Sequence, residues 1–341
     1  MSSDGETIYM AFNQAVYAID AGNGNHKWNC PYDPEGDRTF FAPPTVTEDG
    51  LLYVGDFANG IVALDASTGA VEWGPVQLDD GDGRIVGGST VAGDLLLVPS
   101  GNGRIYARNI TDGSAAWTFP AEFQDPLGHP IWSAPVVEGQ RVFFTSMDHN
   151  VYAVDMAQGG QLWEATSEFG GAIPDSPVLV DRLVLAGTLG HELIALDADR
   201  GRVAWTFDAG DWIWGSPVVG DGVAYFGDLA GQLHAVDVSS GSEIQSAALS
   251  SRISASPALS EDRIFIAAES GTLFAREIST NSELWNVTLD GDLHTTPLVI
   301  GDTVFVATNG GEPLLSAFDV ENGVARWSFT VSDIDEGCPS G

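Results

Sequence analysis

The sequence predicts an all-β fold of eight consecutive units, each made of four short antiparallel strands. Tryptophan recurs at nearly even intervals along the 341-residue chain. Between the tryptophans, short runs of alternating apolar and polar residues are separated by turn-rich segments, as strands are. No stretch of useful length has the period of a helix. Each unit of a repeat fold packs only on its neighbours, so a chain of this length can form one domain, and we expect a single domain over residues 1–341.

Seven tryptophans mark the same position in successive units. Their spacings are 45, 44, 46, 42, 80 and 42 residues, and the long interval contains one further unit in which Gln245 stands at the tryptophan position. The count of units is therefore eight. The seven anchors are Trp28, Trp73, Trp117, Trp163, Trp205, Trp285 and Trp327.

A turn signature precedes each anchor. Glycine, or asparagine in one unit, stands four positions before the anchor, and these two residues tolerate a positive φ best. An acidic or amide residue stands eight positions before it and can accept backbone N–H bonds in the same turn. The turn residues are Gly24, Gly69, Gly113, Gly159, Gly201, Gly241, Asn281 and Gly323. The acidic or amide residues are Asp20, Asp65, Asn109, Asp155, Asp197, Asp237, Glu277 and Asp319.

Each unit divides into four predicted strands. A small residue followed by proline, as in Ser176-Pro177, precedes the first strand. In the second unit, LLYVG (51–55) and IVALD (61–65) are the second and third strands, and DFANG (56–60) is the turn between them. The fourth strand carries the anchor.

The repeat resembles the PQQ-enzyme repeat of β-propeller proteins, and the resemblance covers essentially the whole chain. Its clearest copies are GIVALDASTGAVEW (60–73) and NVYAVDMAQGGQLW (150–163). It implies an eight-bladed β-propeller of four-stranded antiparallel blades. In that family the tryptophans dock between neighbouring blades, so the resemblance assigns the seven anchors to architecture. Many propellers with this repeat bind no quinone.

The two ends of the chain suggest how the first blade is completed. SSDGETIYMAF (2–12) aligns with VTEDGLLYVGDF (46–57), so the first unit lacks its first strand, and we expect the C-terminal segment EGCPSG (336–341) to supply it. Cys30 and Cys338 are the two cysteines. A disulfide between them would lock this closure, although three strand spacings separate the strands concerned unless loops fold inward.

The charge balance excludes some partners. Asp and Glu number 48, Lys and Arg 13, and the net charge is −35. A nucleic-acid binder needs a basic surface, and an anionic membrane surface would repel this chain. An acidic surface with Lys27 as its one lysine resembles those of proteins from halophilic archaea, and the alternative is an ordinary acidic protein from a mesophile. No apolar run reaches the length of a membrane span, so no membrane insertion is expected.

The compartment stays open at this point. The first residues lack a charged segment followed by an apolar one, which is the pattern of a signal peptide. We expect an extracellular or cell-surface protein of a haloarchaeon if such a segment was removed, and a cytoplasmic protein otherwise. Two sequons, at Asn109 and Asn286, are compatible with export.

A candidate ligand site is expected where the loops between blades enter the central channel of the propeller. A column of apolar residues, Phe40, Val86, Ile131, Ile173, Ile213, Ile253 and Leu293, is predicted to pack between blades. Successive side chains of an extended segment point to opposite sides, so the residue after each member of this column is expected to face the channel mouth. Three tryptophans that are not anchors fall in these loops, which suggests an aromatic site. The candidate binding residues are Phe41, Trp132, Asp175, Trp212, Trp214, Arg252 and His294. The alternative is that these rings only cap the channel or pack between blades.

No metal site or catalytic motif is expected. His129, His149, His191 and His294 come from four different units without ligand spacing. DDGDGR (79–84) does not complete a calcium loop.

Two functions compete. The first is a non-enzymatic binding or assembly scaffold, which the resemblance to BamB-like propellers implies; its partner would be another protein or a small planar ligand, and no cofactor is expected. The second is a PQQ- and calcium-dependent quinoprotein dehydrogenase that oxidises alcohols or sugars. Such enzymes have long insertions and adjacent cysteines, whereas the units here are short and the two cysteines lie far apart. Asp175 is the one base that the enzyme hypothesis nominates. We favour the scaffold.

Overall fold

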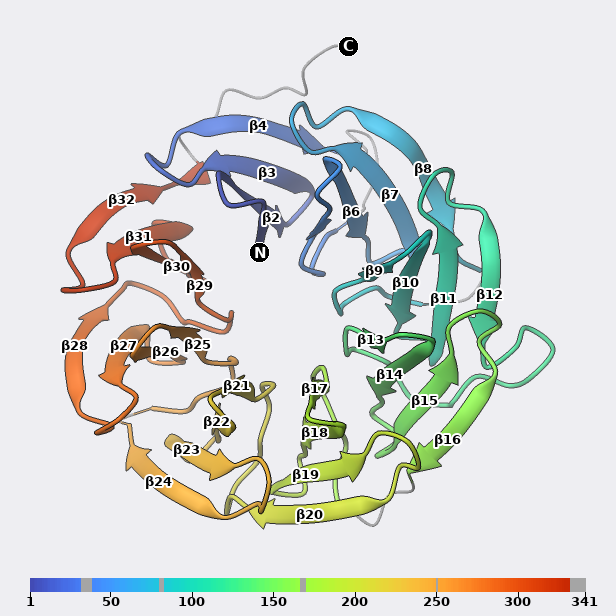
Figure 1. Ribbon diagram of the computed structural model, residues 1–341. Coiled ribbons are helices and arrows are strands. Elements are labelled where there is room, and N and C mark those ends of the chain that lie inside the picture. Colours follow the sequence, from blue (N-terminus) through green and yellow to red (C-terminus); the bar gives the residue numbers. More distant parts are fainter. Residues whose placement is uncertain (32–38, 80–82, 166–169, 250, 332–341) are drawn as a thin grey trace. The chain divides into compact units, whose positions relative to one another are not determined.

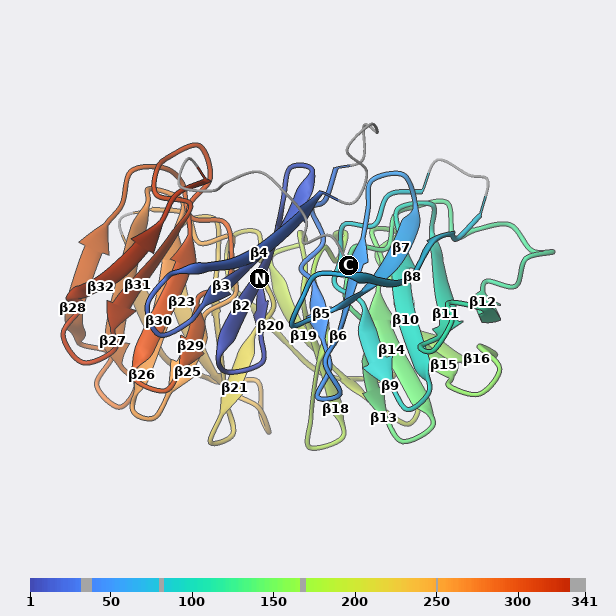
Figure 2. The same cartoon turned by 90° about the horizontal axis from the view of Figure 1, so that it is seen from above.

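The chain is an all-β, eight-bladed β-propeller whose blades are four-stranded antiparallel sheets. The computed structural model describes residues 1–31, 39–79, 83–165, 170–249 and 251–331. The described residues fall into two compact units. Residues 1–165 with Pro174–Pro177 form the first unit, and residues 170–173 with 178–331 form the second. Within each unit the first strands of the blades lie along the inner side of an arc and the fourth strands along its outer side (Figures 1 and 2).

The first unit holds four blades. Their strands are β1 (Ser2–Ser3), β2 (Thr7–Phe12), β3 (Ala15–Asp20) and β4 (His26–Pro31); β5 (Thr45–Val46), β6 (Leu51–Gly55), β7 (Gly60–Asp65) and β8 (Val71–Gln77); β9 (Thr90–Ala92), β10 (Leu95–Ser100), β11 (Arg104–Asn109) and β12 (Ala115–Phe119); and β13 (Val136–Glu138), β14 (Arg141–Thr145), β15 (Val151–Asp155) and β16 (Gln161–Ala165).

The second unit holds the other four blades. Their strands are β17 (Val178–Val180), β18 (Leu183–Gly187), β19 (Glu192–Asp197) and β20 (Val203–Asp208); β21 (Val218–Gly220), β22 (Val223–Gly227), β23 (Gln232–Asp237) and β24 (Glu243–Ala248); β25 (Ala258–Ser260), β26 (Arg263–Ala268), β27 (Thr272–Glu277) and β28 (Glu283–Thr288); and β29 (Leu298–Ile300), β30 (Thr303–Ala307), β31 (Leu315–Asp319) and β32 (Ala325–Phe329).

The hydrophobic core lies between neighbouring blades. The second and third strands are buried on both faces, as the patterns of β6 and β7 show. One cluster joins Tyr53 and Ala63 of the second blade to Leu96 and Tyr106 of the third. Fourth strands such as β20 alternate between exposed and half-buried residues. Each blade therefore buries its apolar surface against its neighbours, as repeat architectures do.

Most of the tryptophan anchors hydrogen-bond to the following blade. Five indole N–H groups each donate to a backbone carbonyl of the next blade, over 2.8 to 3.0 Å. The donor and acceptor pairs are Trp28 and Ala66, Trp73 and Ile110, Trp117 and Met156, Trp205 and Val238, and Trp285 and Val320. The rings of Trp163 and Trp327 pack against Phe143 and Phe305 of their own blades. An indole therefore both fills the groove between two blades and satisfies a backbone carbonyl in it.

The turn before the anchor explains the constant spacing inside each unit. Asp65 Oδ1 accepts N–H bonds from Ser67 and Thr68, which caps the turn. Gly69 has a φ of 75°. A Cβ atom at Gly69 would lie 2.6 Å from Cε3 of Trp28, so the indole of the preceding blade occupies the space that a side chain would need.

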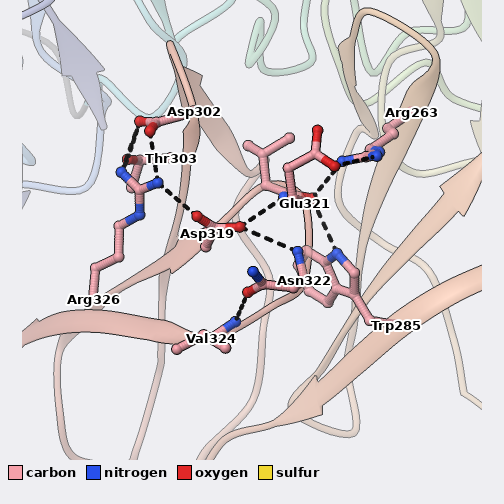
Figure 3. A network of polar contacts seen from close by, with 10 residues as sticks. Arg263, Trp285, Asp302, Thr303, Asp319, Glu321, Asn322, Val324 and Arg326 are labelled. Carbon is pink, nitrogen blue, oxygen red and sulfur yellow. Dashed lines mark hydrogen bonds and ion pairs between the residues drawn. The ribbon is translucent and has the colours of Figure 1, made fainter.

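The seam between the last two blades adds charged contacts (Figure 3). Arg263 and Trp285 both donate to the carbonyl of Val320, and Arg263 also binds Glu321 at 2.9 Å. Within the last blade, Arg326 of β32 binds the carboxylates of Asp302 and Asp319, each at 2.7 Å. These contacts lie at the solvent-exposed turns, where salt weakens ion pairs.

The first blade corrects one expectation. Its first strand is β1, at the N-terminus: Ser2 pairs with Tyr9, and Ser3 pairs with Ile8. Asp4 makes this possible, because its Oδ1 accepts the N–H groups of Glu6 and Thr7 and so folds the chain back on itself. The expectation that the first unit lacks a first strand of its own is wrong, because β1 occupies the edge of β2. The C-terminal segment expected to supply the strand, 336–341, lies outside the described residues.

The predicted disulfide remains a prediction. Cys30 is buried at the end of β4, in the core cluster that also contains Trp28 and Phe40. Cys338 and Glu336 lie outside the described residues.

Candidate functional site

The loop that joins one blade to the next is held by backbone hydrogen bonds to both. In the loop after β20, the N–H of Ile213 donates to the carbonyl of Thr188, in the blade before the loop, at 3.1 Å. The carbonyl of Trp212 accepts from the N–H of Leu229, in the blade after it, at 2.9 Å. The loop is therefore fixed from two sides, and its side chains are presented by a rigid backbone.

The same pair of bonds recurs in other loops. After β24, Ile253 donates to Asp228 at 3.1 Å, and Glu269 donates to Arg252 at 2.9 Å. In the first unit, Ile131 donates to the carbonyl of Ser100 at 3.1 Å. The repeat thus places the same pair of backbone hydrogen bonds in several loops that carry different side chains.

Each loop buries one apolar side chain, and at Ile213 and Leu293 the residues on both sides of it are exposed. The predicted column is correct at six positions and shifted by one residue at Val86. There Ile85 is buried instead, because its N–H bonds to Asp56 at 3.1 Å and its side chain covers Gly55. The buried residues are Phe40, Ile85, Ile131, Ile173, Ile213, Ile253 and Leu293.

Two exposed indoles flank Ile213 in the second unit. Trp212 is 45% exposed and Trp214 is 38% exposed. The N–H of Trp212 donates to the carboxylate of Asp211 at 2.7 Å. Burying a large aromatic side chain is worth several kcal/mol, so two indoles left partly in water on a fixed loop form a surface suited to a binding partner.

A polar cluster lies on the next two loops of the same unit. His294 Nδ1 lies 3.3 Å from Ser254 Oγ and 3.8 Å from Glu269 Oε1, and His294 Nε2 lies 3.9 Å from Asp292 Oδ2. Arg252 is exposed one residue before Ile253. The second unit therefore holds Trp212, Trp214, Arg252 and His294 on three successive loops.

The remaining three candidates lie in the first unit, on three different loops. Phe41 is 60% exposed, and its ring lies 4.3 Å from that of Phe57 between centroids. Trp132 is half-buried, and its carbonyl approaches Gly87 so closely that a Cβ there would lie 2.0 Å from the oxygen. The Asp175 carboxylate accepts the N–H of Ser176 at 2.7 Å.

Among the described residues, no three His, Cys, Asp or Glu side chains gather as ligands for a metal ion would. In the same part of the chain no helix has the length and apolar character needed to span a membrane.

Two features were missed from the sequence. Phe123 is 89% exposed in the loop after β12. His234 is buried in β23 between Asp228 and Glu243. Aligning the third strands would have shown His234 at a position that is tyrosine in three other blades, Tyr17, Tyr106 and Tyr152.

A protein-family comparison fits this repeat. The family described as outer membrane protein assembly factor BamB matches residues 12–170, 147–244 and 229–337. The chain belongs to this BamB-like propeller family. BamB of Yersinia pestis is 28% identical over 222 residues, which cover 60% of this chain and 55% of that protein. The putative dehydrogenase XoxF of Paracoccus denitrificans is 33% identical over 151 residues, covering 36% of this chain and 25% of that protein. The chain spans about half the length of the BamB relatives that it matches.

Solved structures resemble the BamB-like fold along nearly the whole chain. BamB from Moraxella catarrhalis has a TM-score of 0.72 at 15% identity, covering 99% of this chain and 98% of that one. A europium-containing methanol dehydrogenase has a TM-score of 0.75 at 13% identity, covering 89% and 81%. Since a scaffold component and an enzyme share the architecture, the fold does not decide between the two functions.

Proposed function

We propose that this chain is a non-enzymatic binding scaffold that holds a segment of another protein against the loops of its second unit. The observation that carries the proposal is the pair of exposed indoles at Trp212 and Trp214, on a loop bonded to two blades. Tryptophan is the residue most enriched among the energetic centres of protein interfaces. A loop that is already ordered loses little entropy when it binds.

The charge of the chain indicates what the partner segment carries. The chain has 48 acidic against 13 basic side chains, so its surface offers mainly carboxylates. At molar salt only charges in direct contact keep their attraction, which favours a partner that places basic side chains against these carboxylates. Asp211 lies beside Trp212, and Glu269 and Asp292 lie near His294 in the same unit. We therefore expect a segment with Lys or Arg beside an apolar or aromatic residue. The name of the BamB relatives, an assembly factor, supports a role in holding proteins together.

The same proposal includes the cell envelope as the place of action and high salt as the working condition. The support for the envelope is the name of the BamB relatives, which refers to the outer membrane. The support for high salt is the acidic composition, because molar salt screens the repulsion among 48 carboxylates.

The alternative function is a PQQ- and calcium-dependent quinoprotein dehydrogenase. Its specific support is the partial similarity to the putative dehydrogenase XoxF and the aromatic character of the loops. A planar quinone would stack on an indole.

The scaffold proposal is tested by selecting binders from a random 12-residue peptide library at molar salt. We expect selected peptides to combine basic and aromatic residues. Replacing Trp212 and Trp214 together with Ala should weaken their binding at least tenfold, about 1.4 kcal/mol or more. The matched control is Val203→Ala with Ile244→Ala, two exposed apolar side chains on the fourth strands β20 and β24. Peptides that bind both double variants equally well, or a library that yields no binder, would contradict the proposal.

A further inference from the structure

A buried histidine lies beneath the loops that carry the exposed indoles. The side chain of His234, in β23, is 7% exposed, and its ring stacks on Phe226 with centroids 5.1 Å apart. Phe207 of the neighbouring blade meets the same ring edge-on at 5.5 Å. Both ring nitrogens face carboxylates: Nε2 lies 3.2 Å from Asp228 Oδ2, and Nδ1 lies 3.2 Å from Glu243 Oε1.

The two contacts require a proton on each nitrogen. A neutral imidazole has one N–H, so it can donate to only one of two carboxylates and turns a lone pair toward the other. The imidazolium donates to both. Losing the proton therefore costs a hydrogen bond and leaves Asp228, which is 1% exposed, without a cationic partner in this contact.

The groups around the ring favour the charged form. Burial by itself disfavours the imidazolium, but the hydrogen bonds and charges of Asp228 and Glu243 outweigh it and raise the pKa of His234 above its ordinary value of 6.5. From β22 and β20 the ring faces Phe226 and Phe207, which carry no charge. The charged groups that act on His234 are thus Asp228, from the turn after β22, and Glu243, from β24.

Asp228 connects the histidine to two binding loops. Its carbonyl accepts the N–H of Ile253, in the loop that carries Arg252, at 3.1 Å. The next residue, Leu229, donates its N–H to the carbonyl of Trp212 at 2.9 Å. The turn that begins at Asp228 is therefore bonded to the loops on both of its sides.

Other blades use a tyrosine at the same position. Phe226 pairs with His234 as Phe144 pairs with Tyr152. The hydroxyl of Tyr152 donates to Asp148 at 2.6 Å. Burial raises the pKa of Tyr152 further above its ordinary value, so this contact does not titrate near neutral pH. The blade of His234 has the same kind of contact in a form that responds to pH.

We propose that His234 is a proton-operated latch that holds the two loops carrying Trp212, Trp214 and Arg252 while it is protonated and loosens them when it loses its proton. What the latch regulates rests on the proposed binding function, but the latch itself is a property of the free chain. Because the pKa is raised on folding, the stabilisation is fully present below pH 6.5 and is lost as the pH rises through the folded pKa.

The test is amide hydrogen exchange at molar salt between pH 6 and pH 9, corrected for the intrinsic pH dependence of exchange. The protection of the Ile253 and Leu229 amides should fall by roughly tenfold for each pH unit by which the folded pKa exceeds 6.5. The control amides are those of Ile131 and Met147, which make the corresponding bonds in the first unit and should not change. A parallel NMR titration of the His234 ring gives the pKa directly.

Two variants separate a latch from a merely structural histidine. His234→Tyr, which copies the tyrosine of Tyr152, should keep Ile253 and Leu229 protected at both ends of the pH range. His234→Phe, which matches Phe274 at the corresponding position of the next blade, removes the imidazole donor from Asp228 Oδ2 and should lower protection at every pH. The latch is overturned if the His234 ring titrates while the protection of both amides stays the same. It is also overturned if protection in His234→Tyr depends on pH as it does in the wild type. Both measurements use the chain without a peptide, so their failure is distinct from a failure of peptide binding.

Discussion

A single exchange of residues at one blade seam shows how closely neighbouring units are matched. Gln245 replaces the tryptophan anchor, and its Nε2 still donates to the carbonyl of Ile278 at 2.8 Å. Its smaller side chain leaves room at the following turn, where Asn281 stands in place of glycine with a φ of 56°. At the ordinary seam, a Cβ at Gly241 would lie 2.6 Å from Cδ2 of Trp205. The smaller residue at the tryptophan position and the larger residue at the glycine position therefore compensate each other.

This pairing predicts a coupled response to mutation. Gln245→Trp alone should destabilise the chain by about 1–3 kcal/mol, because the indole would overlap Asn281. Adding Asn281→Gly should recover most of the loss, although it removes the 2.9 Å bond from Arg276 Nε to Asn281 Oδ1. Denaturant unfolding of the wild type, both single variants and the double variant measures the coupling energy. Additive effects of the two substitutions would mean that the side chains do not share this space.

The sequence identifies both residues but not their relation. Gln245 and Asn281 are visible as departures from the tryptophan and glycine positions within their own units. Their relation depends on contact across a seam, between residues 36 positions apart, and the spacing inside one unit does not contain that information. His234 is a different case, because its partners, Asp228 and Glu243, lie in a turn and a strand of its own blade. Its position stands out only when the third strands of the blades are aligned.

At the scale of the strand and loop, the repeat predicts most of the architecture. The four strands per unit and the buried residue of each interblade loop follow from alternation of apolar and polar positions. The error at Val86 arises because counting back from Thr90 does not detect one extra residue in the loop. The error at the first blade arises because a strand of two residues, Ser2–Ser3, is too short to have a pattern.

The short N-terminal strand leads to a prediction of its own. Deleting residues 1–4 should lower the Tm by a few degrees, because β2 loses its edge partner and the hydroxyl of Tyr9 loses its 2.8 Å bond to Asp4. Ser2→Thr, which suits a strand, is the matched control and should melt like the parent. The measurement is a thermal scan at molar salt. An unchanged Tm in the deletion variant would show that β1 contributes nothing to the first blade.

At the scale of the whole molecule, charge is the dominant feature that the sequence alone provides. The net charge of −35 opposes a compact state at low ionic strength. The Debye length is about 10 Å at 0.1 M salt and about 3 Å at 1 M, so only molar salt screens neighbouring surface carboxylates. The partner and the place of action do not follow from charge or fold, because one propeller architecture carries many functions.

Salt dependence should therefore be large. We expect the Tm to fall sharply, or the chain to unfold cooperatively, when the salt concentration drops from molar to about 0.1 M. Calorimetry in NaCl and KCl measures the effect, and sucrose at matched water activity controls for exclusion of solute from the surface. Equal Tm values at the two salt concentrations would remove the argument for adaptation to high salt.

The central claim, that the chain binds a partner rather than oxidises a substrate, is tested most directly by titrating it with PQQ and calcium. Quenching of tryptophan fluorescence reports binding at Trp212 and Trp214, and dye-linked oxidation of alcohols or glucose reports turnover. The scaffold account predicts that PQQ binds with a Kd no tighter than about the micromolar range, some −8 kcal/mol, and that no oxidation occurs. Tight binding of PQQ that is lost in Trp214→Ala, together with turnover of an alcohol or sugar, would contradict it.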